Sequence, residues 1–242
     1  MMKPRRLRVV AAGIVVAFAL SRSAAGQEPS VGAPGRTEIL LLGTAGGPPL
    51  RFNRSEPSTL LIIDGRPYLI DCGIGTMRRM LQAGVQSERI KTIFLTHLHS
   101  DHDLGLADVM ANDYFRLRAP RSVPSIHIYG PPQTKELVDA AFRYITITVR
   151  PFASENPSDF QSVNGEFVSP FVPHEIDREG VVFQDDKIRV TAAENTHYAL
   201  MPPEDRKLLK SLFLSNRNAA RRHCLHRRHC PERRCGAAGK GR

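Results

Sequence analysis

Short, mostly apolar runs recur along the chain, and glycine, proline or charged residues interrupt them. This pattern is typical of buried strands joined by turns. Asp64-Gly65 separates two such runs and indicates a tight hairpin turn. The expected strands lie at residues 38–42, 60–63, 68–70, 93–95, 126–129 and 187–192.

Helical spacing is found between several of these strands. Met77, Met80 and Leu81 share one helical face, and this helix is expected to end at Gly84, where glycine tolerates a left-handed cap. Residues 146–187 have no clear period and predict an irregular excursion, as a lid or a wall of a substrate site. Two further helices are expected at residues 104–109 and 134–144.

Residues 96–102 read THLHSDH and combine three imidazoles with a carboxylate directly after an apolar run. Side chains two residues apart point the same way in extended chain, so His97 and His99 can bind one metal ion from one side. Asp101 and His102 face differently and suit a second ion close by, an arrangement that activates water between two metals. The alternative is a polar loop that happens to carry three histidines.

Several side interpretations accompany this motif. Imidazole with carboxylate favours zinc, with manganese or iron left open. Ser100 is expected to cap the helix that follows. The glycine-rich loop 43–49 is interpreted as turns or, alternatively, as a contact for an anionic substrate. His127 and His174 are interpreted as structural.

The net charge of +10 is concentrated at the two ends of the chain. Residues 1–26 carry +5 and residues 216–242 carry +8, which leaves about −3 for residues 27–215. A mildly acidic body does not predict a nucleic-acid-binding face. Nucleic acid is therefore not expected as a partner.

Residues 1–26 have the layout of a secretory signal peptide, with basic residues, the apolar run 9–20 and then small residues. Cleavage is expected near Ala25 or Gly26. A retained membrane anchor is the alternative, although the run is short for a bilayer span. Either way the domain at 27–215 is expected to be periplasmic or secreted, and no other segment predicts a stable membrane span.

Cysteine is concentrated near the C-terminal end, and Cys72 alone lies in the body, which argues against a disulfide framework. Residues 216–242 are rich in arginine, histidine and cysteine and predict a disordered tail without a buried strand or helix face. Three interpretations stay open: the product of a reading-frame shift, a basic arm that binds nucleic acid or acidic membranes, and a zinc knuckle. The knuckle would use Cys224, His226, His229, Cys230 and Cys235.

Several motifs follow one another in a fixed order. They are LLGT at 41–44, DCGIGT at 71–76, the histidine motif at 96–102, IYGP at 128–131 and, after the last expected strand, His197. In this order the chain resembles the metallo-β-lactamase-fold hydrolases over residues 37–200. Within that superfamily it is most similar to the ribonuclease Z and arylsulfatase-like branch.

The resemblance implies an α/β fold, the αβ/βα sandwich, with two zinc ions at the edge where its two sheets meet and a metal-activated hydroxide as nucleophile. It also implies that Asp101 moves the proton as general base. Asp71 would orient a ligand from outside the metal shell, or alternatively cap the end of its strand. The implied metal ligands are His97, His99 and His197 for the first ion and Asp101 and His102 for the second.

The implied reaction is hydrolysis of a phosphodiester, a sulfate ester or a related ester. The expected partner is therefore a small-molecule or ester substrate. Lactone or β-lactam cleavage stays open, because the ligand motif is shared across the superfamily. The resemblance also implies an aspartate that bridges both ions and a final histidine for the second ion, and neither is found after His197. The second half of the sandwich is therefore expected to be incomplete and activity impaired. The alternative is a non-catalytic remnant or a metal- or anion-binding protein, and a homodimer is left open.

Overall fold

A computed structural model describes residues 35–116, 125–157, 162–163, 166–217 and 222–224. The expected signal peptide lies outside the described residues, as do most of the expected tail and all but one of the residues of the expected zinc knuckle. Where the structure is described, no helix is both long enough and apolar enough to span a bilayer.

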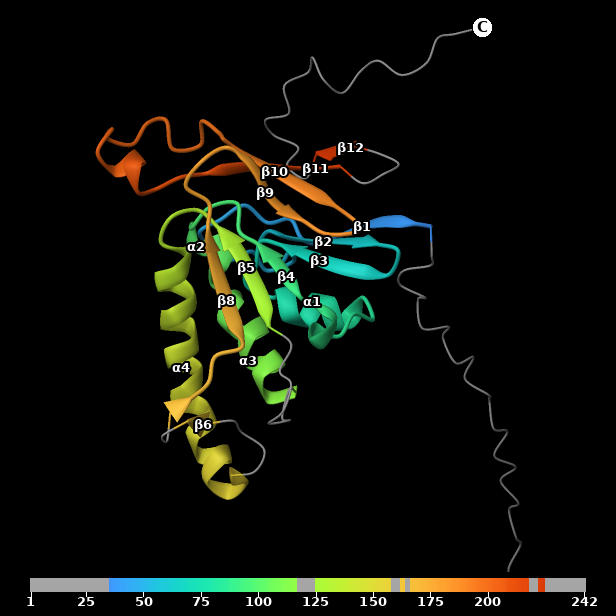
Figure 1. Ribbon diagram of the computed structural model, residues 1–242, viewed down its shortest axis with the longest axis vertical. Helices are drawn as coiled ribbons and strands as arrows, with labels where there is room; N and C mark the ends of the chain where they lie inside the picture. The colour runs from blue at the N-terminus through green and yellow to red at the C-terminus, as the bar shows by residue number, and fades with distance from the viewer. Residues whose placement is uncertain (1–34, 117–124, 158–161, 164–165, 218–221, 225–242) are drawn as a thin grey trace, which may run out of the picture.

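The first sheet has six strands in the order β1-β2-β3-β4-β5-β8 (Figure 1). The first three strands are antiparallel, and β3, β4, β5 and β8 run parallel to one another. The strands are β1 Thr37–Gly43, β2 Ser58–Ile63, β3 Arg66–Ile70, β4 Thr92–Phe94, β5 Ile126–Gly130 and β8 Phe171–Glu175.

Helices cover one face of this sheet (Figure 1). Their apolar faces join the strand side chains in one buried core, in which Met80, Met110 and Val149 represent three different helices. The described helices are α1 Thr76–Gln82, the short α2 Ser100–Asp103, α3 Leu106–Arg116 and α4 Thr134–Glu155, with 3-10 turns η1 Ser87–Arg89 and η3 Asp205–Lys207.

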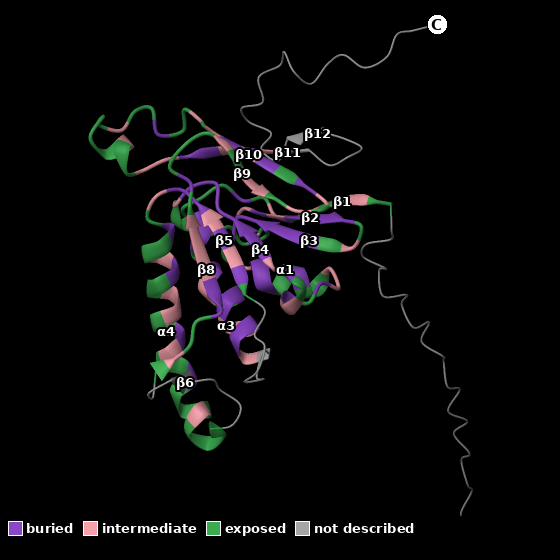
Figure 2. Cartoon of the chain, viewed as in Figure 1, coloured by how far each residue is buried: buried purple, intermediate pink, exposed green. Residues whose placement is uncertain are grey.

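A second, antiparallel sheet in the order β12-β11-β10-β9 packs on the opposite face of the first sheet (Figure 1). A second core fills the space between the sheets and includes Phe94 from the first sheet and Val190 and Leu214 from the second. Figure 2 shows that burial is greatest in the central strands of the first sheet, which have a layer on each face. The strands are β9 Gly180–Gln184, β10 Arg189–Glu194, β11 Leu212–Arg217 and β12 Arg222–Cys224.

Most of the expected elements are confirmed. The hairpin turn between β2 and β3 has positive φ at both Asp64 (49°) and Gly65 (80°), the conformation that two-residue hairpins prefer. Gly84 likewise has φ 73° just after α1.

The expectation of an irregular excursion at 146–187 is wrong. Helix α4 continues to Glu155, because the buried positions Val138, Ile145 and Val149 extend its apolar face past the expected end. Threonines and Pro151 in the second half of α4 hide that periodicity in the sequence. The segment also contains the hairpin of β6 Ser162–Val163 and β7 Glu166–Phe167, and the strands β8 and β9.

Strand β8 was not predicted from the sequence, because Pro173 argues against a strand. It lies at the edge of the first sheet, where proline is tolerated. The boundary expected between residues 215 and 216 also falls inside a strand. Strand β11 pairs with β10 up to Arg217, and the buried Asn216 continues the inward alternation of Leu212 and Leu214. Strand β12 adds a second segment of the expected tail to this sheet.

Candidate metal centre

The histidine motif lies where β4 ends, beside the end of the neighbouring parallel strand β3. The chain after β4 stays extended as far as His99, and α2 begins at Ser100. His99 is therefore the residue at the N-cap position, one residue earlier than expected. The motif lines a cavity of about 650 Å³ together with the glycine-rich loop after β1 and residues at both ends of the loop between β10 and β11.

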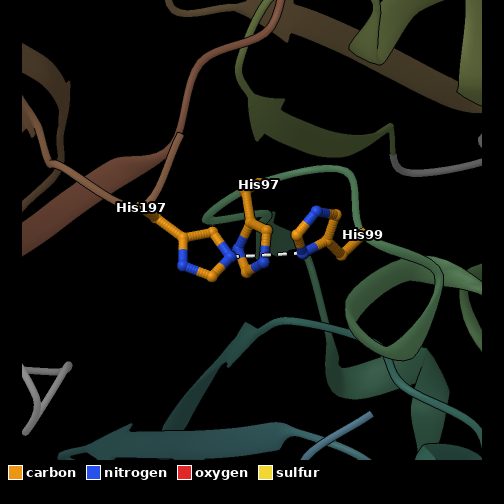
Figure 3. Close-up of side chains that lie close together, drawn as sticks. All are labelled: His97, His99 and His197. Carbon is orange, nitrogen blue, oxygen red and sulfur yellow. Dashed lines mark hydrogen bonds between the residues drawn. The ribbon is translucent and has the colours of Figure 1, made fainter. Parts of the chain in front are cut away.

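The structure brings His97, His99 and His197 together, although His197 is about a hundred residues further along the chain (Figure 3). One ligand atom from each imidazole lies within 4.8 Å of the other two. His197 Nε2 is 3.2 Å from His99 Nδ1. His97 is buried, whereas the other two imidazoles are exposed to the cavity side. Among the described residues, this is the one group of three or more histidine, cysteine or acidic side chains arranged to hold an ion.

Asp101 and His102 lie next to this group. The His97 and His102 ring centroids are 4.0 Å apart, and His102 Nε2 is 3.7 Å from Asp101 Oδ2. Both residues are buried and line the same cavity. The two residues that the resemblance assigns to a second ion are therefore adjacent to the three assigned to the first, and their ligation stays a prediction.

Asp71 fixes the orientation of His102. Its Oδ2 lies 2.8 Å from His102 Nδ1, which leaves His102 Nε2 directed toward Asp101. The same carboxylate accepts hydrogen bonds from the Thr96 amide, at 2.8 Å, and from the Thr96 hydroxyl. Asp71 thus ties the end of β3 to the start of the motif and fixes the His102 ring, and its role in orienting a metal ligand stays a prediction.

The electrostatics of the pocket are dominated by buried carboxylates. Burial acts to lower the pKa of His102, but Asp71, Asp101 and Asp103 outweigh it and raise the pKa above the usual value. Burial and repulsion from neighbouring carboxylates raise the pKa of Asp103 to about 6, although His102 acts in the opposite direction. Such a concentration of negative charge favours a bound cation.

The glycine-rich loop has a defined role at its centre. The Gly47 amide donates a 2.8 Å hydrogen bond to Asp101 Oδ2. A Cβ atom at position 47 would lie 2.2 Å from the Asp101 Cβ, so only glycine fits there without displacing the carboxylate. The sequence suggested turns or substrate contact for this loop, and this contact with a candidate ligand was missed.

The loop that carries His197 is anchored at both ends. The Asn195 amide donates to the Ser211 carbonyl, and the Leu212 amide donates to the Thr96 carbonyl within the histidine motif. The Asn195 Oδ1 also accepts a 2.9 Å hydrogen bond from the His197 backbone amide. Tyr198, the next residue, packs against all three histidines and was missed, because a tyrosine beside a lone histidine gives no metal-site signal in sequence.

Comparison with known proteins places this geometry in context. A family model described as the anti-Pycsar protein Apyc1 matches residues 37–141. The chain is 30% identical over 167 residues to ribonuclease Z of Mycolicibacterium gilvum, covering 68% of this chain and 54% of that protein. It is 35% identical over 160 residues to ribonuclease Z of Methanothermobacter thermautotrophicus, covering 66% and 44%. The chain thus spans about half the length of the curated relatives that it matches.

Two solved structures share the arrangement of sheets and helices. The short form of human tRNase Z (ELAC1) superposes with a TM-score of 0.52 at 22% identity, covering 76% of this chain and 64% of that one. YhfI from Bacillus subtilis, a metallo-β-lactamase fold protein, superposes with a TM-score of 0.50 at 13% identity, covering 77% and 61%. At these identities the likeness concerns the fold alone.

Proposed function

Because the chain belongs to the metallo-β-lactamase-fold superfamily, in its ribonuclease Z branch, we propose that it is a metal-dependent hydrolase of phosphodiesters. The observation that carries the proposal is the meeting of His97, His99 and His197 beside Asp101 and His102 at the wall of one cavity. Three converging imidazoles are a common ligand set for a catalytic metal ion.

The donor set fits a first-row divalent ion, with zinc as the first choice and manganese or iron as alternatives. His97, His99 and His197 would hold the first ion, and Asp101 and His102 would contribute to a second. A bound ion supplies Lewis acidity, which lowers the pKa of water and stabilises negative charge on the ester oxygens.

The residues of the chain itself supply the remaining roles. Asp71 holds the His102 imidazole through Nδ1 and so leaves Nε2 available as a ligand atom. The Gly47 amide holds one oxygen of Asp101. Asp101 would then accept a proton from the attacking water, as a general base.

The relatives favour a phosphodiester over the other ester classes, because the curated relatives that match at 30–35% identity are named ribonuclease Z. The earlier expectation that nucleic acid is not a partner is at odds with these names. We therefore propose a phosphodiester of nucleotide or nucleic-acid type as the substrate, with sulfate esters as the competing class. Export to the periplasm or the exterior stays part of the proposal, resting on residues 1–26 alone.

The test is hydrolysis of bis(p-nitrophenyl) phosphate and p-nitrophenyl sulfate by the purified chain, with zinc or manganese added. We expect slow cleavage of the phosphodiester that stops with EDTA and in the His97→Ala/His99→Ala double variant. His174→Gln is the matched control, because His174 lies on β8 and lines no part of the cavity. Cleavage that survives in the double variant, or preference for the sulfate ester, would contradict the proposal.

A further inference from the structure

Tyr198 occupies an unusual place beside the candidate metal centre. It follows His197 in the loop after β10, and only 6% of its surface is exposed. Its ring centroid lies 5.9 Å from that of His97, 5.1 Å from His99 and 5.3 Å from His197. One aromatic ring therefore contacts every member of the three-histidine group.

The ring of Tyr198 lies beside two segments of the chain, the one that carries His97 and His99 and the one that carries His197. The side chain thus joins two segments that are about a hundred residues apart in the chain.

This link matters because His197 lies on an exposed loop. The residues that follow Tyr198, including Leu200 at 101% exposure and Leu208 at 60%, lie on the surface of the molecule. Backbone bonds of Asn195 and Leu212 fix the ends of the loop to the motif region. The His197 ring itself contacts both other imidazoles, with centroids 4.7 Å from His97 and 5.0 Å from His99. The Tyr198 ring adds a second aromatic contact from the same segment to each of them.

We propose that Tyr198 is a positioning residue for the metal centre, which holds the His197 loop against the His97–His99 segment through its ring. This inference rests on the metal site of the proposed function, but not on the reaction. Tyr198 lines no part of the cavity, so it acts through the three histidines and not on the substrate. Preorganised ligands bind an ion more tightly, because less freedom is lost on binding.

The test is metal affinity, measured by titrating Co²⁺ into the full chain and following the visible absorption of the bound ion. Tyr198→Leu removes the ring and the hydroxyl but keeps apolar volume, and we expect about tenfold weaker binding, the lower end of the range for residues that support ligating histidines. Tyr198→Phe removes the hydroxyl but keeps the ring, and we expect it to bind Co²⁺ as the unchanged chain does. Tyr144→Leu, at an exposed tyrosine on α4, is the matched control and should bind as the unchanged chain does.

Thermal unfolding of the metal-free variants separates positioning from general stability. A purely structural role would lower the metal-free melting temperature of Tyr198→Leu and leave the Co²⁺ affinity unchanged, which would overturn the proposal. A loss in Tyr198→Phe as large as in Tyr198→Leu, a similar loss in Tyr144→Leu, or no Co²⁺ binding by the unchanged chain would overturn it as well. If Co²⁺ binds with the expected order of affinities but the phosphodiester is not cleaved, the proposed function fails and the role of Tyr198 stands.

Discussion

Replacing Asp71 with alanine should destabilise the chain even when no metal is present. The carboxylate accepts bonds from the Thr96 amide and hydroxyl and contacts His102 Nδ1 at 2.8 Å, all in buried surroundings. A buried amide left without its acceptor costs roughly 1–3 kcal/mol, and a lost charge-assisted bond costs roughly 1.5–3 kcal/mol. Together the two terms predict a loss of about 2.5–6 kcal/mol in the free energy of unfolding.

That loss is a large part of the total stability of a typical domain, so it is readily measured by urea denaturation of the metal-free protein followed by circular dichroism. Asp139→Ala is the control, because Asp139 pairs with Lys135 on the exposed face of α4 and should leave the midpoint unchanged. A loss below about 1 kcal/mol for Asp71→Ala would refute the assigned bonds.

Three further perturbations test other parts of the structure. Gly47→Ala should displace Asp101, because the added Cβ has no room, and should reduce metal-dependent phosphodiester hydrolysis at least about tenfold. An unchanged rate would show that the loop does not hold the carboxylate. Leu214→Ala should cost about 2–5 kcal/mol in urea denaturation, since Leu214 is buried between the two sheets, and a negligible loss would mean that β11 does not pack there. Burial acts to raise the pKa of Asp185, but bonds from the Tyr68 hydroxyl, two backbone amides and Arg66 lower it on balance. A lowered pKa in the folded state gives stability that is present above the unfolded value of about 3.9 and lost as pH falls below it. The urea midpoint of Asp185→Asn should therefore change less between pH 5 and pH 3 than that of the unchanged chain. An equal pH dependence of the midpoint in both proteins would contradict this.

The first sheet could be predicted largely from sequence because local signals agree there. The apolar runs of β2 and β3 flank Asp64-Gly65, whose positive φ values are those that this dipeptide favours. The second half of the chain gave weaker signals. Strand β8 carries Pro173, and β11 ends in polar residues, so their places depend on pairing with β5 and β10, which local sequence does not encode.

The candidate metal centre divides in the same way. His97 and His99 could be paired from their spacing alone, whereas His197 was placed by resemblance and by its position after a strand. Tyr198 and Gly47 act through contacts between loops that are far apart in sequence. Such contacts depend on tertiary packing and leave no periodic pattern by which they could have been recognised.

The most direct test of the proposed metal-dependent hydrolysis is a zinc titration of bis(p-nitrophenyl) phosphate cleavage by the unchanged chain and by His197→Ala, with bound zinc measured in the same samples. His197 is the informative position, because only the fold brings it to His97 and His99. The account predicts that the unchanged chain binds zinc and gains activity with it, and that His197→Ala loses both. Equal zinc content and equal activity in the two proteins would contradict it.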